Sequence, residues 1–91
     1  MMVVPYSVSR IKVGDYAKFK PVFDQASAMR KSYGAKGTNL FRDVDSPNDV
    51  IVFIEWANLE DARKFFKSDD LKNALQRSGA IKSEFYLLNS I

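Results

Sequence analysis

The segment from Val50 to Trp56 restricts the possible folds of this chain more than any other. It reads Val-Ile-Val-Phe-Ile-Glu-Trp, and its β-branched and aromatic residues predict a strand. Successive side chains of a strand point to opposite faces of a sheet, so this strand is apolar on both faces until Glu55. Both faces of the sheet therefore require a cover.

Three further strands are predicted around this segment. Val3–Val13, Thr38–Asp45 and Glu84–Leu88 are apolar or alternating runs bounded by turn residues. Asp45–Asp49 contains Pro and Asn in positions typical of a tight turn. That turn predicts an antiparallel hairpin between the second and third strands.

Two helices are predicted between the strands. The first covers Tyr16–Tyr33 and ends at Gly34, and Pro21 inside it predicts a short opening turn followed by the main helix. Its apolar stripe, at steps of three and four, consists of Tyr16, Phe19, Phe23, Ala26, Met29 or Arg30, and Tyr33. The second helix begins at an Asn58 cap and restarts at a Ser68 cap, so it is expected in two pieces.

The predicted order is β-α-β-β-α-β, which is typical of an α+β, ferredoxin-like antiparallel sheet with both helices on one face. Ninety-one residues supply about one hydrophobic core, so residues 1–91 are expected to form a single domain. The second face of the sheet then has no cover from its own chain.

That uncovered face predicts an association. Leaving Val52, Ile54 and Trp56 in water would forgo on the order of 1.5–3 kcal/mol for each side chain. An exposed patch of this kind marks an interface or a pocket. We therefore expect two sheets to pack face to face in a homodimer that encloses a barrel.

Composition excludes several kinds of chemistry. The chain contains no cysteine and no histidine, so it lacks thiolate sites and the commonest general base and metal ligand. None of its four glycines forms a phosphate-binding loop. We therefore expect no metal and no cofactor.

The charge pattern and the apolar runs bear on partners and location. The net charge is +3, but the basic residues are scattered, and Asn48–Trp56 lacks the basic and aromatic signature of an RNA-recognition strand. No apolar stretch is long enough to span a bilayer, and residues 1–8 do not read as a signal peptide. The sequence thus predicts a cytoplasmic protein with no nucleic-acid partner and no membrane association.

The chain also resembles a known family. The motifs are Val13-Gly14-Asp15-Tyr16, Asp45–Asp49, and Phe53–Glu60 followed by Phe66-Lys67-Ser68. They are similar to the antibiotic biosynthesis monooxygenases, a family of dimeric α/β barrels, over nearly the whole chain. The resemblance implies a ligand pocket in each subunit, between the sheet and its helices or inside the barrel. It also implies that some members oxygenate aromatic polyketides without metal or flavin, whereas others degrade heme with a histidine that this chain lacks.

The residues predicted to bind a substrate are Trp56, Ser9, Arg42, Ile54 and Val52. The resemblance implies that Trp56 lines the pocket, where its indole would offer a flat apolar wall and an N–H donor. The alternative is that Trp56 packs in the core without a ligand.

Ser9 and Arg42 are the predicted polar contacts to the substrate. Ser9 could instead relieve crowding within the sheet. Arg42 faces the ligand only in the register that also turns Leu40 inward, and a slip by one residue would present Phe41 and Asn39 in their place.

Together these features predict a dimeric barrel that binds a small apolar or aromatic molecule. If it is an enzyme, the expected class is cofactor-independent oxygenation of an aromatic, polyketide-like substrate, with no catalytic residue identified. In such chemistry the anion of the substrate reduces oxygen, and the protein supplies a dry pocket and donors to the anion. The alternative is a ligand-binding or structural dimer without catalytic activity, which the missing histidine favours.

Overall fold

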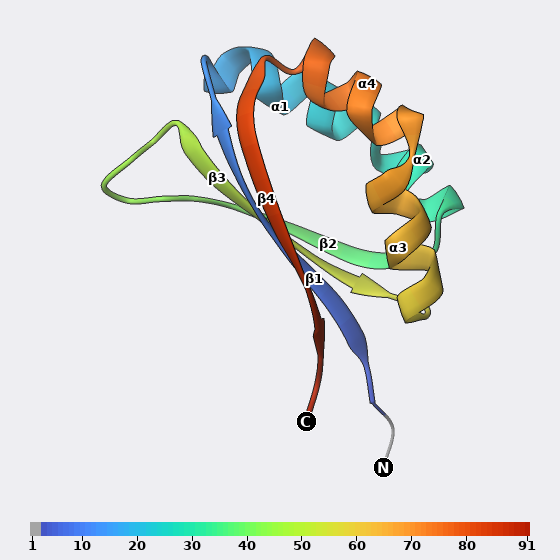
Figure 1. Ribbon diagram of the computed structural model, residues 1–91. Helices are drawn as coiled ribbons and strands as arrows, with labels where there is room; N and C mark the ends of the chain where they lie inside the picture. Colours follow the sequence, from blue (N-terminus) through green and yellow to red (C-terminus); the bar gives the residue numbers. More distant parts are fainter. Residues whose placement is uncertain (1–2) are drawn as a thin grey trace.

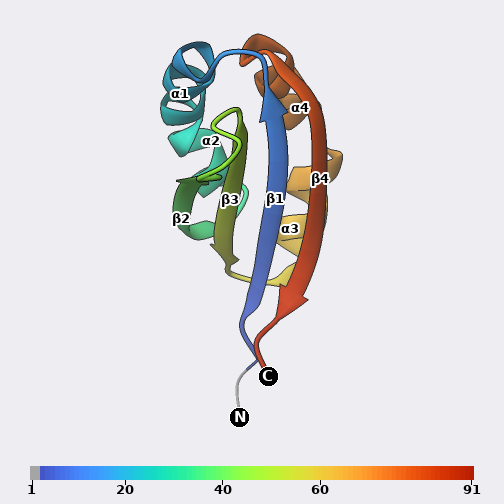
Figure 2. The ribbon, with the colours of Figure 1, turned by 90° about the vertical axis from the view of Figure 1, so that its left-hand side faces the viewer.

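A computed structural model describes residues 3–91 and shows one open four-stranded antiparallel sheet with four helices on one face (Figure 1). The strand order is β2-β3-β1-β4, and Figure 2 shows the sheet from its uncovered face with the helices behind it. In chain order the elements are β1 (Pro5–Val13), α1 (Tyr16–Gln25), α2 (Ser27–Ser32), β2 (Ala35–Arg42), β3 (Asp49–Trp56), α3 (Leu59–Lys67), α4 (Asp69–Arg77) and β4 (Ala80–Asn89). This is the predicted ferredoxin-like α+β fold.

The hydrophobic core lies between the sheet and the helices. Every second residue of β3 points into it, and these residues are Val50, Val52, Ile54 and Trp56. In β1 the corresponding residues are Ser7, Ser9, Ile11 and Val13, all of which are buried. The predicted alternation of both strands is therefore confirmed.

The prediction of which face lacks a cover was wrong. Val52, Ile54 and Trp56 lie beneath the helices of their own chain and are almost completely buried. The uncovered face, which we call the open face, carries the alternate side chains. Its apolar members are Tyr6, Val8, Phe41, Ile51, Phe53, Tyr86 and Leu88. Because β3 is apolar on both faces, its sequence does not indicate which face the helices cover.

Both helical segments are divided into two pieces, but the first divides at Ala26 and not at Pro21 as predicted. The first segment breaks at Ala26, where the backbone leaves helical geometry, and Pro21 lies inside α1 without ending it. The break deprives the carbonyl of Phe23 of a helical partner, and the Arg30 side chain donates to that oxygen over 2.8 Å. The expected short opening turn before Pro21 was therefore wrong.

The predicted helix caps are confirmed. The side chain of Asn58 accepts a hydrogen bond from the backbone N–H of Asp61 at 2.8 Å, and Ser68 accepts one from that of Leu71 at 3.1 Å. Such bonds satisfy donors that the first turn of a helix leaves free. These local signals are enough to place the starts of α3 and α4.

The bounds of all four strands differ from the prediction, by one or two residues at the start of β3 and β1 and by more in β2 and β4. β2 begins and ends three residues before the predicted Thr38–Asp45, because the Asp43 side chain accepts from the backbone N–H groups of Asp45 and Ser46 and starts the turn early. β4 extends well beyond Glu84–Leu88, since it pairs with β1 along the whole length of that strand.

Gly34 forms the turn between α2 and β2, and its replacement by alanine should destabilise the protein. Its φ of 108° is unfavourable for any residue with a Cβ, and an added Cβ would collide with the carboxyl group of Asp61. We expect Gly34→Ala to lower the free energy of unfolding by about 1–3 kcal/mol, measured by urea denaturation. Gly37→Ala is the matched control, because a Cβ there meets nothing within 4 Å. Equal stability of the two variants would contradict this prediction.

Candidate functional site

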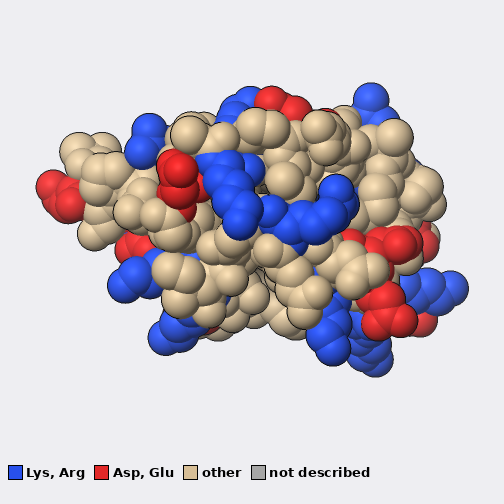
Figure 3. All heavy atoms as spheres, turned by 90° about the horizontal axis from the view of Figure 1, so that it is seen from above, with Lys and Arg blue, Asp and Glu red and all other residues tan. Residues whose placement is uncertain are grey.

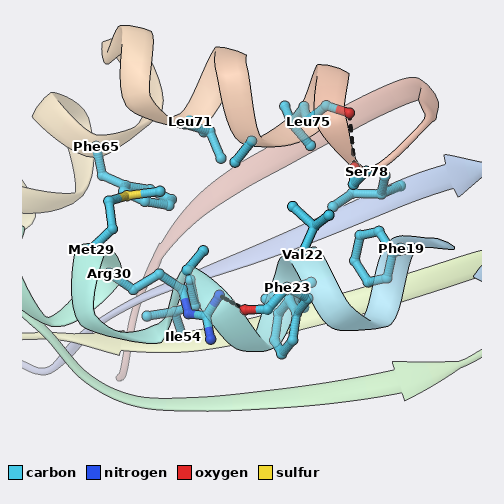
Figure 4. Close-up of a pocket in the computed structure, with 14 residues that line it drawn as sticks. Phe19, Val22, Phe23, Met29, Arg30, Ile54, Phe65, Leu71, Leu75 and Ser78 are labelled. Carbon is cyan, nitrogen blue, oxygen red and sulfur yellow. Dashed lines mark hydrogen bonds between the residues drawn. The ribbon is translucent and has the colours of Figure 1, made fainter. Parts of the chain in front are cut away.

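A cavity of about 60 Å³ lies between the two helical segments and the sheet (Figure 4). Most of its wall is aliphatic and aromatic, with residues from α1, α2, α3, α4, β1 and β3. The apolar lining residues are Ile11, Phe19, Val22, Phe23, Ala26, Met29, Val52, Ile54, Phe65, Leu71, Ala74 and Leu75. Such a wall favours an apolar guest and excludes bulk water.

Two lining residues carry polar side chains, and these are Arg30 and Ser78. The hydroxyl group of Ser78 donates to the backbone carbonyl of Leu75 over 2.8 Å, so its proton is already used. Ser78 is uncharged, so Arg30 is the only charged residue among the described residues that line the cavity.

Arg30 is held in a defined position from α2. Its guanidinium donates to the carbonyl oxygen of Phe23 and lies 4.1 Å from the centre of the Phe23 ring. Burial lowers the pKa of Arg30 from its usual value, and the charge of Asp24 partly offsets this effect. The guanidinium nevertheless stays protonated at neutral pH, as arginine side chains do in proteins.

A second hollow, which we call the basic cleft, adjoins the cavity on the side of α2 and β2. It has a volume of about 230 Å³ and shares Phe23 and Arg30 with the cavity. Its other lining residues are Ser27, Lys31, Ala35, Lys36, Gly37 and Thr38. The lining thus contains three basic residues and no acidic one.

Two of the residues predicted to bind a substrate line the cavity. Val52 and Ile54 form part of its floor on the sheet. Their role in binding stays a prediction.

Trp56 and Ser9 are not among the residues that line the cavity. Trp56 is 1% exposed, packs against Phe65 with ring centres 5.1 Å apart, and donates from Nε1 to Oγ of Ser7 over 2.9 Å. Ser9 is buried on the same face of β1. Phe65 both lines the cavity and touches Trp56, so it connects the indole to the ligand space.

Arg42 lies on the helix side of the sheet, in the register that also turns Leu40 inward. Its guanidinium lies 4.0 Å from the centre of the Tyr16 ring, and its Nε donates to the carbonyl of Pro47 over 3.0 Å. Arg42 is exposed and does not line the cavity or the basic cleft. The five predicted residues are therefore not brought together at one place.

Two acidic residues, Asp43 in the β2–β3 loop and Asp49 at the start of β3, form ion pairs with one arginine. The Arg10 side chain contacts Asp43 at 3.0 Å and Asp49 at 2.9 Å. Hydrogen bonds from Arg10 and from two backbone N–H groups lower the pKa of Asp43. Within residues 3–91 no group of three or more potential ligands is arranged for a metal ion. No helix in this part of the chain is long and apolar enough to cross a membrane.

The fold is shared with several solved structures. A candidate antibiotic biosynthesis monooxygenase from Bordetella bronchiseptica superposes with a TM-score of 0.84 at 16% identity, covering 99% of each chain. SnoaB, a cofactor-independent oxygenase from Streptomyces nogalater, gives a TM-score of 0.78 at 18% identity over 100% of this chain and 95% of that one. At these identities the likeness shows the fold alone.

Comparison of sequences identifies the family. No curated protein matches the chain. The sequence profile described as antibiotic biosynthesis monooxygenase matches residues 2–77, which is most of the chain. The chain therefore belongs to the antibiotic biosynthesis monooxygenase family.

Proposed function

We propose that this protein is a cofactor-independent monooxygenase that acts on a small aromatic, polyketide-like substrate held in the cavity. The observation that carries the proposal is the apolar cavity between the helices and the sheet. Membership of the family supports the reaction class, and a solved neighbour, SnoaB, is described as a cofactor-independent oxygenase.

The composition of the cavity wall restricts the chemistry. The lining contains no carboxylate and no lysine, and the chain has no histidine, so no lining residue is suited to act as a general base. The substrate must therefore be acidic enough to lose a proton itself. Its carbanion adds O₂ to give a peroxide, which takes up a proton and then loses water to leave a carbonyl group. The protein contributes a dry space in which the anion and oxygen meet.

The cavity must widen to admit a ring. An apolar cavity of about 150 Å³ holds benzene, whereas this one measures about 60 Å³. Met29 in the wall has an unbranched, adaptable side chain, and its displacement would enlarge the space.

The experiment changes the size of the cavity and follows binding and turnover. Naphthohydroquinones and flavonols are added, quenching of the single tryptophan reports binding, and an oxygen electrode reports uptake above the protein-free rate. We expect Met29→Ala to bind more tightly and Ala74→Leu to bind about tenfold or more weakly, because Ala74 lines the cavity. Ala57→Leu, at an exposed position, is the matched control. Two results would contradict the proposal: equal affinity of the original chain and all three variants, or oxygen uptake no faster than without protein.

The second candidate function is a binding module without catalysis. It is favoured by the small cavity and by the absence of a general base from its wall. Saturable quenching that follows cavity size without any oxygen uptake would select this function over the first.

The proposal includes a homodimer formed through the open face. The largest apolar side chains on this face lie partly in water, with Phe41 and Tyr86 56% and 58% exposed. Basic and acidic residues of the same face lie together near one end of β1, and they are Arg10, Lys12, Asp49, Lys82 and Glu84. A second copy supplies the same apolar area and both signs of charge, so the face is suited to pair with itself. Two sheets packed in this way would enclose the predicted barrel.

We place this function in the cytoplasm, as the sequence predicts. Cell fractionation followed by detection of the protein tests the location.

A further inference from the structure

Arg30 forms a common wall between the cavity and the basic cleft. The residue is only 8% exposed, and it lines both hollows. Figure 4 shows its guanidinium beside Phe23 and Ile54, on the opposite side of the cavity from α4. A guest in the cavity therefore lies next to a cation that also faces the cleft.

The charge of Arg30 is positioned but not neutralised. A guanidinium has five N–H donors, and the side chain uses a single hydrogen bond, to the carbonyl of Phe23. Within residues 3–91 no carboxylate forms an ion pair with Arg30 at 4.0 Å or less. No buried side-chain nitrogen among the described residues lacks a hydrogen-bond partner, so the unused N–H groups of Arg30 open into the basic cleft. Donors that are held in place at the boundary of two hollows and have no carboxylate partner are available to an anion from outside.

The remainder of the basic cleft supports an anion. Lys31 also lines it and has no acidic partner among the described residues, whereas Lys36 pairs with Glu55 at 3.3 Å. Ser27 and Thr38 place hydroxyl side chains in the same lining. Figure 3 shows Lys and Arg side chains near the centre of the side of the molecule that is seen from above, with Asp and Glu both beside them and toward the ends.

We propose that the cavity and the basic cleft form one site for an amphipathic anion, with its apolar body in the cavity and a carboxylate bound by Arg30 and Lys31. The planar fork of arginine matches the two oxygens of a carboxylate, which makes this the best-fitting anion. The inference uses the cavity of the proposed function and narrows its substrates to aromatic acids. It does not depend on oxygenation.

The test compares an acid with its neutral counterpart. We would titrate 2-naphthoate and methyl 2-naphthoate into the full chain at constant ionic strength. The screening of charge–charge interactions by salt is then the same in both titrations. Methyl signals of Ile54, Leu71 and Leu75 report the cavity in NMR spectra, and the Nε–H signal of Arg30 reports the cleft. We expect the acid to shift both sets of signals with one saturation curve, and to bind at least about tenfold more tightly than the ester.

Variants assign the preference to the two basic residues. Arg30→Met should abolish the preference for the acid over the ester, because it removes the charge that the carboxylate would meet. Lys31→Met should weaken binding of the acid several-fold, and because Lys31 is exposed this variant should fold normally. Lys64→Met, at an exposed position of α3 outside both linings, is the control and should change nothing.

Several results would overturn the inference. They are equal affinity for acid and ester, shifts of the Arg30 signal without shifts of the cavity methyl groups, a preference for the acid that survives Arg30→Met, and no saturable binding of either compound. A failure of the proposed function looks different, because the acid would then bind as described while no member of an aromatic acid series stimulated oxygen uptake.

Discussion

Replacement of Trp56 by alanine is expected to remove about 3–5 kcal/mol from the free energy of unfolding. The side chain is 1% exposed, lies against Phe65 and Phe66, and donates its N–H to Ser7. A domain of this size is stable by only about 5–15 kcal/mol, so the loss would unfold a large fraction of the molecules under mild conditions. Urea denaturation followed by circular dichroism measures the change without relying on tryptophan fluorescence.

A milder substitution separates packing from the hydrogen bond. Trp56→Phe retains an aromatic ring and removes the N–H, so it should destabilise by about 1–3 kcal/mol, and Ser7→Ala should do so by a similar amount because it leaves the indole N–H without a partner. The double variant should then cost less than the sum of the two single ones. If Trp56→Ala were nearly as stable as the original chain but bound ligands poorly, the indole would be a binding residue outside the core.

Conversion of the proposed dimer into monomers is the expected result of Phe53→Lys. Phe53 lies at the centre of the open face and contacts Tyr6, with ring centres 5.2 Å apart. In a face-to-face dimer, a lysine at this position would bury a charge on each side of the contact, and buried unpaired charges are strongly unfavourable. Sedimentation velocity at micromolar concentration would show the loss of the dimer, while the circular dichroism spectrum of the folded chain persists.

Val44→Lys is the control for this variant. Val44 lies in the β2–β3 loop and is 94% exposed, so a lysine there should leave the dimer intact. A monomeric original chain would contradict the proposed assembly, as would a Phe53→Lys variant that sediments like the original.

Local signals in the sequence were sufficient to predict the fold. The caps at Asn58 and Ser68 and the glycine turn at Gly34 depend on neighbours within a few residues, and each lies where it was predicted. The identity of the covered face was not predictable in this way, because β3 is apolar on both sides. It depends on contacts between strands that are far apart in the sequence: Ser7 of β1 lies on the covered side and accepts the hydrogen bond of the Trp56 indole there.

The site was predicted less completely than the fold. Val52 and Ile54 were chosen from strand alternation and do line the cavity. Arg30 was not predicted as a site residue because a basic residue in a helix usually lies on the solvent-exposed surface. Its burial depends on the break at Ala26 and on the carbonyl of Phe23, which no periodicity encodes. The available signal was its position on the apolar stripe of the first helix, where a cation is unusual.

The order of the strands has a consequence for the solution behaviour of the protein. β2 and β4 form the two margins of the sheet, and face-to-face pairing would leave both with unpaired backbone groups. Such margins can recruit further chains and grow into fibrils. Two features make these edges less regular. The β4 edge carries the charged residues Lys82 and Glu84, and the β2 edge has a shift of register near Gly37. These two features are expected to disfavour polymerisation along the edges of this strongly apolar sheet.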